Sequence, residues 1–156
     1  MIANNIIART SDRVAINTDQ EINCRIQCQI EANVERYSQL GQQAISQRLE
    51  ELDAEWDIER VLETMAPIIT LSGICLSVTN SRRWLLLSLA VQSFFLQHAI
   101  QGWCPPIPVL RRLGIRTTQE INQERVALKA LRGDFGGAFA DANMSGAAKA
   151  IVAARK

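Results

Sequence analysis

Two apolar stretches decide the fold: APIITLSGICLSV at residues 66–78 and WLLLSLAVQSFFLQHAI at residues 84–100, with TNSRR at residues 79–83 between them. Neither apolar stretch contains an aspartate, glutamate, lysine or arginine. At ~1.5 Å of rise per residue, the second stretch forms a helix of roughly 25 Å, close to the ~30 Å hydrocarbon core of a bilayer. The first stretch reaches a similar length when Val61–Met65 extend it. The pattern therefore predicts a helical hairpin that is short but able to lie in a membrane.

The ends of the second stretch also favour a membrane. Its first eight residues are apolar on every side, unlike a surface helix with one apolar face. Trp84 and Trp103 stand at its two ends, where indole rings prefer the headgroup level, and Arg82 and Arg83 can extend to the surface from one end. The alternative is a soluble all-α bundle in which the same hairpin is the buried core and a second copy covers it.

The second stretch also contains polar side chains, which in a membrane must face another helix. These residues are Gln92, Gln97, His98 and Gln101. A packed hairpin or a homo-oligomer satisfies this requirement. Ser72, Gly73 and Ser77 are the candidate positions of close approach on the first helix.

The segment after the hairpin predicts how the chain leaves it. Pro105 and Pro106 end the helix and are expected to hold an extended backbone through Ile107-Pro108. Three arginines follow this exit, against two in the turn between the apolar stretches. The excess of positive charge predicts that both termini are cytoplasmic.

The whole chain is predicted to be all-α. A capping box at Thr18–Glu21 starts an amphipathic helix that runs to about Leu40, and Gly41 separates it from a second helix that begins near Gln42. Another capping box at Thr117–Glu120 starts a last helix that stops at Gly133. The expected organisation is a mobile N-terminus at 1–17, an amphipathic helical region at 18–58, the hairpin and its exit at 59–118, the capped helix at 119–133 and a flexible or weakly helical tail at 134–156.

Composition excludes some classes of partner. In 156 residues, 17 lysines and arginines balance 16 aspartates and glutamates, so no basic field points to nucleic acid. The first twenty residues lack the apolar core of an export signal, and four cysteines are too few for a disulfide framework. Cys24 and Cys28 supply two ligands where zinc needs about four. We therefore expect a reducing compartment, no metal and no cofactor.

The hairpin and its exit resemble a known family. Two short apolar helices are followed by Gly102-Trp103-Cys104-Pro105 and then by Leu113-Gly114-Ile115-Arg116-Thr117. This order resembles the YgaP-like inner-membrane domain family, bacterial domains of unknown function with a Cys-Pro pair after the second helix and a Leu-Gly-x-x-Thr segment beyond it. The resemblance covers about residues 59–118. It implies a self-associating bacterial inner-membrane hairpin and no known reaction.

The flanks are similar to a subgroup of longer stand-alone bacterial members of that family. A segment like Glu55–Arg60 precedes the hairpin in that subgroup, and one like Ala127–Phe135 follows it. Some relatives join the hairpin to a rhodanese sulfurtransferase domain. The catalytic loop of that domain is not found in this sequence, so sulfur chemistry is not implied.

Cys104 is a weak candidate for thiol chemistry, and no residue is predicted to be catalytic with more support than this. It stands between Trp103 and Pro105 on a rigid backbone, where Arg111 or Arg112 would favour the thiolate. A polar cluster of His98, Gln97 and Gln101 is expected toward the same end of the helix.

A charge cluster is predicted where the hairpin brings its two ends together, with carboxylates before the hairpin pairing with arginines after it. Its members are Asp57, Glu59, Arg60, Glu63, Arg111, Arg112 and Arg116. The predicted function is a small bacterial inner-membrane protein that acts as a structural or interaction module through self-association. Its expected partners are the lipid bilayer and a second copy, with no protein partner identified. The alternatives are the soluble oligomeric bundle and a membrane thiol or persulfide carrier that uses Cys104.

Overall fold

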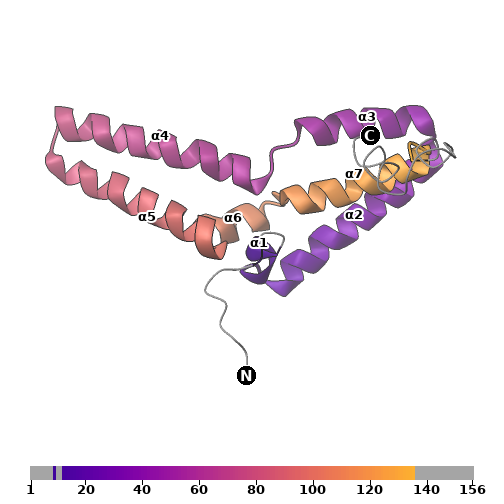
Figure 1. Ribbon diagram of the computed structural model, residues 1–156, viewed down its shortest axis with the longest axis horizontal. Coiled ribbons are helices and arrows are strands. Elements are labelled where there is room, and N and C mark those ends of the chain that lie inside the picture. The colour runs from indigo at the N-terminus through magenta and orange to yellow at the C-terminus, as the bar shows by residue number, and fades with distance from the viewer. Residues whose placement is uncertain (1–8, 10–11, 136–156) are drawn as a thin grey trace, which may run out of the picture. The chain divides into compact units, whose positions relative to one another are not determined.

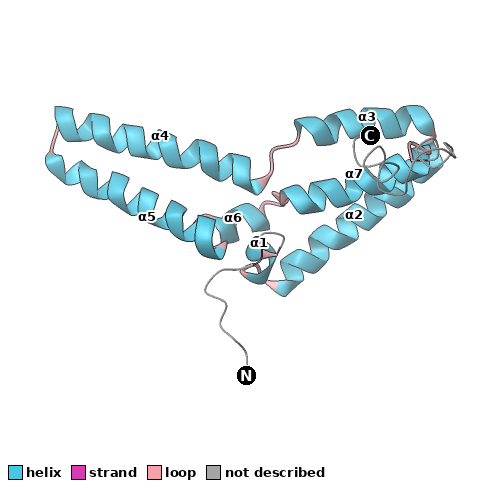
Figure 2. Ribbon diagram, viewed as in Figure 1, coloured by secondary structure: helices cyan, strands magenta, loops and turns pink. Residues whose placement is uncertain are grey.

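The computed structural model describes residue 9 and residues 12–135, and every regular element within them is a helix. The predicted all-α fold is thereby confirmed (Figures 1 and 2). The helices are α1 (Arg13–Ile16), α2 (Gln20–Leu40), α3 (Gln42–Ala54), α4 (Ile58–Thr79), the 3₁₀ turn η1 (Arg82–Trp84), α5 (Leu85–Gln101), α6 (Ile107–Arg112) and α7 (Thr118–Arg132).

The chain divides into two compact units. Residues 1–26 and 56–119 form the first unit, which contains α1, the hairpin helices α4 and α5, and α6. Residues 27–55 and 120–156 form the second, which contains α3 and most of α2 and α7. The predicted tail at 134–156 lies outside the described residues from position 136 onward.

The second unit is a small helical bundle held by an apolar core. Ile45, Leu49 and Leu52 of α3 pack with Ile121 and Leu128 of α7. Gly41 separates α2 from α3 as predicted, and its φ of 86° is the left-handed conformation that glycine adopts without a Cβ penalty. Gly133 ends α7 in the same conformation, and its N–H donates to the carbonyl of Lys129.

The amphipathic helical region predicted at 18–58 contains a second helix break besides the one at Gly41. α3 ends at Ala54, and α4 begins at Ile58 with Asp57 as its N-cap, since Arg60 N donates to Asp57 Oδ1 at 2.8 Å. The start predicted at Thr18 is also two residues early, because Asp19 Oδ1 accepts the N–H of Glu21 and α2 begins at Gln20.

α4 and α5 form the predicted hairpin and run side by side within the first unit (Figure 1). Asn80 and Ser81 close the turn, and the Ser81 hydroxyl accepts the N–H of Arg83. α4 begins eight residues before the apolar stretch at 66–78 and passes through Pro67 without ending. The end of the hairpin at which α4 begins and α5 ends is called its open end below.

Two predictions about the open end are wrong. The exit is not extended: Pro106 is the N-cap of α6, and Pro108 occupies its first turn. Proline is tolerated there because the first helical N–H groups have no intrahelical partner. Residues 12–17, expected within a mobile N-terminus, instead form α1 and the turn beside it, and Val14 is 2% exposed. Val14 packs into a core with Ile58, Leu62, Cys104, Ile107 and Leu110.

Candidate functional site

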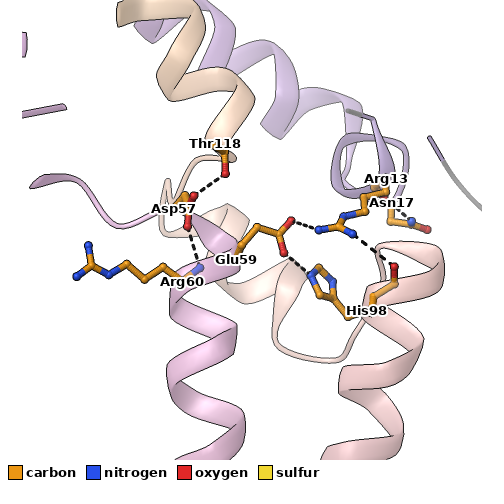
Figure 3. A network of polar contacts seen from close by, with 8 residues as sticks. Arg13, Asn17, Asp57, Glu59, Arg60, His98 and Thr118 are labelled. Carbon is orange, nitrogen blue, oxygen red and sulfur yellow. Dashed lines mark hydrogen bonds and ion pairs between the residues drawn. The ribbon is translucent and has the colours of Figure 1, made fainter. Parts of the chain in front are cut away.

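Glu59 is the centre of a polar network at the open end of the hairpin (Figure 3). Its Oε1 accepts from Arg13 Nη2 at 2.9 Å, and its Oε2 lies 2.8 Å from His98 Nε2. The three side chains come from α4, α1 and α5 respectively. Burial alone would raise the pKa of Glu59, but the hydrogen bonds to His98 and Arg13 outweigh it and hold the pKa below its usual value. The network therefore favours a charged carboxylate.

α1 completes the carboxyl end of α5. Arg13 Nη1 donates to the carbonyl of Ala99 at 3.4 Å, and Asn17 Nδ2 donates to the carbonyl of Gln101 at 2.9 Å. The last carbonyls of a helix have no partner within it, so these bonds satisfy groups that α5 leaves open. Gly102 lets α1 approach, because a Cβ at that position would lie 2.2 Å from the carbonyl oxygen of Arg13.

Asp57 ties the start of α4 to the start of α7. Thr118 Oγ1 donates to Asp57 Oδ2 at 2.5 Å, while the other carboxylate oxygen caps α4. A backbone bond from Ile58 N to the carbonyl of Arg116 lies beside this pair at 2.9 Å. Contacts from α1 and from the chain after α6 therefore hold the two helices together at the open end.

The predicted pairing of carboxylates with exit arginines is wrong for Asp57 and Glu59. The hairpin does bring its ends together, but α1 inserts Arg13 where an exit arginine was expected. Arg111 is completely buried and donates instead to the carbonyl of Ile115 and to Asn23 Oδ1. Of the remaining members, Arg60 lies over the Trp56 ring, Glu63 and Arg112 are exposed, and Arg116 is buried.

The predicted polar cluster on α5 is divided by the structure. His98 is 2% exposed and faces Glu59, as expected for a polar residue that must face another helix. Gln97 and Gln101 instead pair with each other, with Gln97 Nε2 donating to Gln101 Oε1 at 3.3 Å. Gln92 faces α4 and donates to Thr70 Oγ1 at 2.9 Å.

Cys104 is buried at the open end, with 3% of its surface exposed, whereas Cys24, Cys28 and Cys75 are exposed. Burial raises the pKa of the Cys104 thiol to about 11, and the negative charge of Glu59 adds to the rise. A thiolate favoured by nearby arginines is therefore not what this environment supports. Among the described residues, no group of three or more histidine, cysteine, aspartate or glutamate side chains is placed to hold a metal ion.

Small and polar residues make the closest contact between α4 and α5. Gly73 meets α5 so closely that a Cβ there would lie 2.5 Å from Ser88 Oγ, which confirms Gly73 as a position of close approach. Ser88 Oγ donates to the carbonyl of Thr70 at 3.0 Å, and Gln92 adds its bond to the same threonine. Ser72 is exposed and bonds within its own helix.

Large apolar residues cover the outside of the hairpin. On α4 the most exposed are Ile68, Leu71 and Val78, at 58%, 60% and 84%. On α5 they are Leu86, Leu89 and Leu96, at 68%, 65% and 63%. Of the described residues, one stretch, Gln42–Thr79, which contains α3 and α4, is long and apolar enough to cross a membrane, and 17% of its most apolar part is buried. α4 supplies its apolar part, since α3 carries Arg48, Glu50, Glu51 and Asp53.

Sequence reasoning missed two groups of interacting residues. Arg13 and Asn17 lie on a helix of four residues, which is too short to show a periodic apolar pattern. In the second unit, Glu124 is completely buried, and its carboxylate accepts from Arg48 Nε at 2.8 Å and from Asn33 Nδ2 at 3.3 Å. The signal for this pair was present, because Glu124 lies one turn from Ile121 and Leu128, on the apolar side of α7.

Comparisons with protein-family models, with curated proteins and with solved structures find no match to this chain.

Proposed function

We propose that this protein is anchored in a lipid bilayer by the α4–α5 hairpin and acts there as a structural or interaction module. One observation carries the proposal: large apolar side chains cover the outside of the hairpin, while small and polar residues make its closest helix–helix contact. Gly73 meets Ser88, which bonds to the carbonyl of Thr70, whereas Ile68, Leu71, Leu86 and Leu89 are between 58% and 68% exposed. Water would leave this apolar surface uncovered, and the hydrocarbon of a bilayer covers it.

The composition of the interface matches what drives helix association in lipid. Lipid tails solvate leucine as well as another helix does, so helices in a bilayer meet through small residues and through hydrogen bonds. Gly73 supplies the close approach, and Ser88 and Gln92 supply two interhelical hydrogen bonds. The outward apolar residues are then covered by hydrocarbon.

The open end provides the boundary of the anchor. Glu59 precedes the apolar stretch that begins at Ala66, and its bonds to Arg13 and His98 hold the first turn of α4 to α1 and to the end of α5. Arg111, Arg112 and Arg116 follow the hairpin on the same side, against Arg82 and Arg83 in the turn. This distribution supports an orientation with both termini cytoplasmic. The resemblance of residues 59–118 to the YgaP-like family supports a bacterial inner membrane.

Self-association is the second part of the proposal. Leu86, Leu89, Ser93, Leu96 and Ile100 are all exposed on α5. Their spacing alternates between three and four residues, which is the spacing of a coiled-coil seam. A second copy of α5 would bury this stripe. Oxidative crosslinking tests this pairing in a protein whose four native cysteines are replaced by serine. Ser93→Cys, within the stripe on α5, should form a crosslinked dimer. Ser72→Cys, on the outside of α4, should not.

The anchor is tested by floating membranes from expressing bacteria on a sucrose gradient and then washing them with alkaline carbonate. Flotation separates membranes from aggregates, and the wash removes peripheral proteins. We expect the protein to float and to resist the wash. Leu71→Arg, in the middle of α4, should release a large fraction, because an arginine at a bilayer centre costs about 2.5–3.5 kcal/mol.

Leu131→Arg is the matched control. Leu131 is 48% exposed on α7, so the same change removes a comparable surface leucine outside the hairpin. We expect this variant to float like the wild type. A wild-type protein found in the soluble fraction would contradict the anchor and favour the soluble oligomer, in which second copies cover the outward residues.

A further inference from the structure

An apolar pocket of about 290 Å³ lies between α4 and α5, and its lining reaches from Leu87 on α5 to the segment that follows α5 at the open end. Leu62, Ala66 and Ile69 of α4 form one wall, and Val91, Phe94 and Phe95 of α5 form the other. Cys104, Pro105 and Pro106 also line it, from the segment that follows α5. Its volume is near the lower end of the ~300–1,000 Å³ range of small-molecule sites.

Small side chains keep this space open. Ala66 and Ala90 contribute only methyl groups to the lining, and the proline pair places rigid rings at its edge. Toward the turn of the hairpin the arrangement differs, because Gly73 and Ser88 bring α4 and α5 into direct contact. Apart from Leu87, the lining residues of α4 and α5 therefore lie between this contact and the open end.

The lining offers nothing to a polar ligand. All twelve residues are apolar side chains, prolines or cysteine, and none is charged. The cysteine is Cys104, and burial raises its pKa to about 11, so the thiol stays neutral at physiological pH. A polar group placed in this pocket would lose hydrogen bonds to water without replacing them, whereas a hydrocarbon chain would lose none.

The rim of the pocket joins the outer surface of the hairpin. Met65, Leu87 and Phe94 line the pocket and are also 38%, 37% and 42% exposed. They belong to the same apolar surface that the proposed anchor places in lipid. A hydrocarbon chain can therefore pass from the bilayer into the pocket without crossing water.

We propose that this pocket binds one acyl chain of a membrane lipid, held between Ala66 on α4 and Val91 on α5. The inference rests on the proposed function for the source of the chain. The occupied pocket would fill the gap between the two helices near the open end, where Gly73 and Ser88 no longer hold them together.

The test uses the full chain in vesicles of phosphatidylethanolamine and phosphatidylglycerol that contain a phospholipid with a diazirine on one acyl chain. After illumination, mass spectrometry locates the labelled residues. Labelling of the pocket residues Ala66, Val91 or Cys104 supports the site, and labelling of the outer residues Leu71 or Leu86 reports the bilayer around the hairpin. Ala66→Phe should reduce labelling of the pocket about tenfold, while Leu71→Phe, on the outside of the same helix, should leave it unchanged.

Ala66→Leu is a milder variant in case the phenylalanine disrupts the hairpin, and it should give a smaller loss in the same direction. Outer labelling without pocket labelling would overturn the acyl-chain site and leave the anchor intact. Pocket labelling that persists in both Ala66 variants would also overturn the site, because filled space cannot hold a chain. Absence of outer labelling would contradict the anchor independently of the pocket.

Discussion

Gly73 on α4 and Ser88 on α5 lie so close together that a Cβ on Gly73 would stand 2.5 Å from Ser88 Oγ and 3.2 Å from the carbonyl oxygen of Trp84. At this contact the Ser88 hydroxyl also donates a hydrogen bond to the carbonyl of Thr70 at 3.0 Å. One glycine thus sets both the separation of the helices and the position of an interhelical hydrogen bond.

Gly73→Ala is expected to destabilise the hairpin. In an unobstructed helix interior this change stabilises by about 1 kcal/mol, because alanine is the better helix former. Here the new methyl group displaces Ser88 Oγ from Thr70, which costs about 1 kcal/mol for the hydrogen bond and more for the crowding against Trp84. The midpoint of thermal unfolding in detergent should therefore fall.

Ser88→Ala supplies the control for this contact. It removes the oxygen that the new methyl group would strike, so Gly73→Ala should cost less in the Ser88→Ala background than in the wild type. Such a coupling is the signature of direct contact. Additive effects of the two changes would mean that Gly73 does not act through Ser88.

The regular helices could be predicted from the sequence because their signals are local. The two apolar stretches mark the hairpin, and Gly41 and Gly133 mark helix ends through a backbone conformation that only glycine adopts at low cost. The break before Ile58 was harder to predict. It depends on Asp57 capping α4, and no glycine marks the end of α3.

The open end could be predicted only in part, because its contacts join distant segments. Glu59 and His98 were both candidates, but their pairing depends on where α1 docks, and the four residues of α1 carry no periodic pattern. The extended exit predicted from the prolines was wrong for a related reason. Pro106 and Pro108 are compatible with an extended chain and with the start of a helix, and the buried contacts of Ile107 and Leu110 favour the helix.

Glu59→Gln should lower the stability of the first unit at neutral pH by about 2 kcal/mol, since it removes the negative charge that strengthens the hydrogen bonds of Glu59 to Arg13 and His98. The folded-state pKa of Glu59 is below the usual value of 4.5. The stabilisation is therefore present above about pH 4.5 and is lost as pH falls through the lower folded-state pKa. The difference in thermal midpoint between wild type and variant should shrink at acidic pH.

Glu63→Gln is the matched control for this pH dependence. Glu63 lies about one turn further along α4 and is exposed, so its replacement should change the midpoint little at any pH. A difference between wild type and Glu59→Gln that stays constant down to pH 3 would show that the carboxylate charge is not what stabilises the open end.

Glu124→Ala should strongly destabilise the second unit. Glu124 is completely buried, and its loss removes the carboxylate on which Arg48 Nε is held at 2.8 Å. Breaking a buried pair in this way costs about 3–5 kcal/mol. Burial alone would lower the pKa of Arg48, but its hydrogen bonds to Glu124 and Glu51 raise it. Hydrogen exchange of the α3 amides measures the effect on this unit by itself.

Glu51→Ala separates the two partners of Arg48. Glu51 bonds the same guanidinium at 2.8 Å but is 59% exposed, so its removal should cost about 0–1 kcal/mol. Equal protection of α3 in both variants would contradict the assignment of Glu124 as the buried partner that holds α3 to α7.

Cys104 should react more slowly with a water-soluble alkylating reagent at neutral pH than the exposed Cys24 and Cys28, which lie outside the hairpin. A rise in its pKa from 9.0 to about 11 lowers the thiolate fraction about a hundredfold, and burial of the sulfur slows the reagent further. The rate is measured by mass spectrometry of the full chain in detergent, with Cys24 as the internal standard because it belongs to the same unit, is exposed and lies on α2, outside the proposed anchor. Unfolding in denaturant should make the two rates equal. If Cys104 reacted faster than Cys24 in the folded protein, the neutral, buried thiol would be wrong, and a thiol carrier would become the better account of this segment.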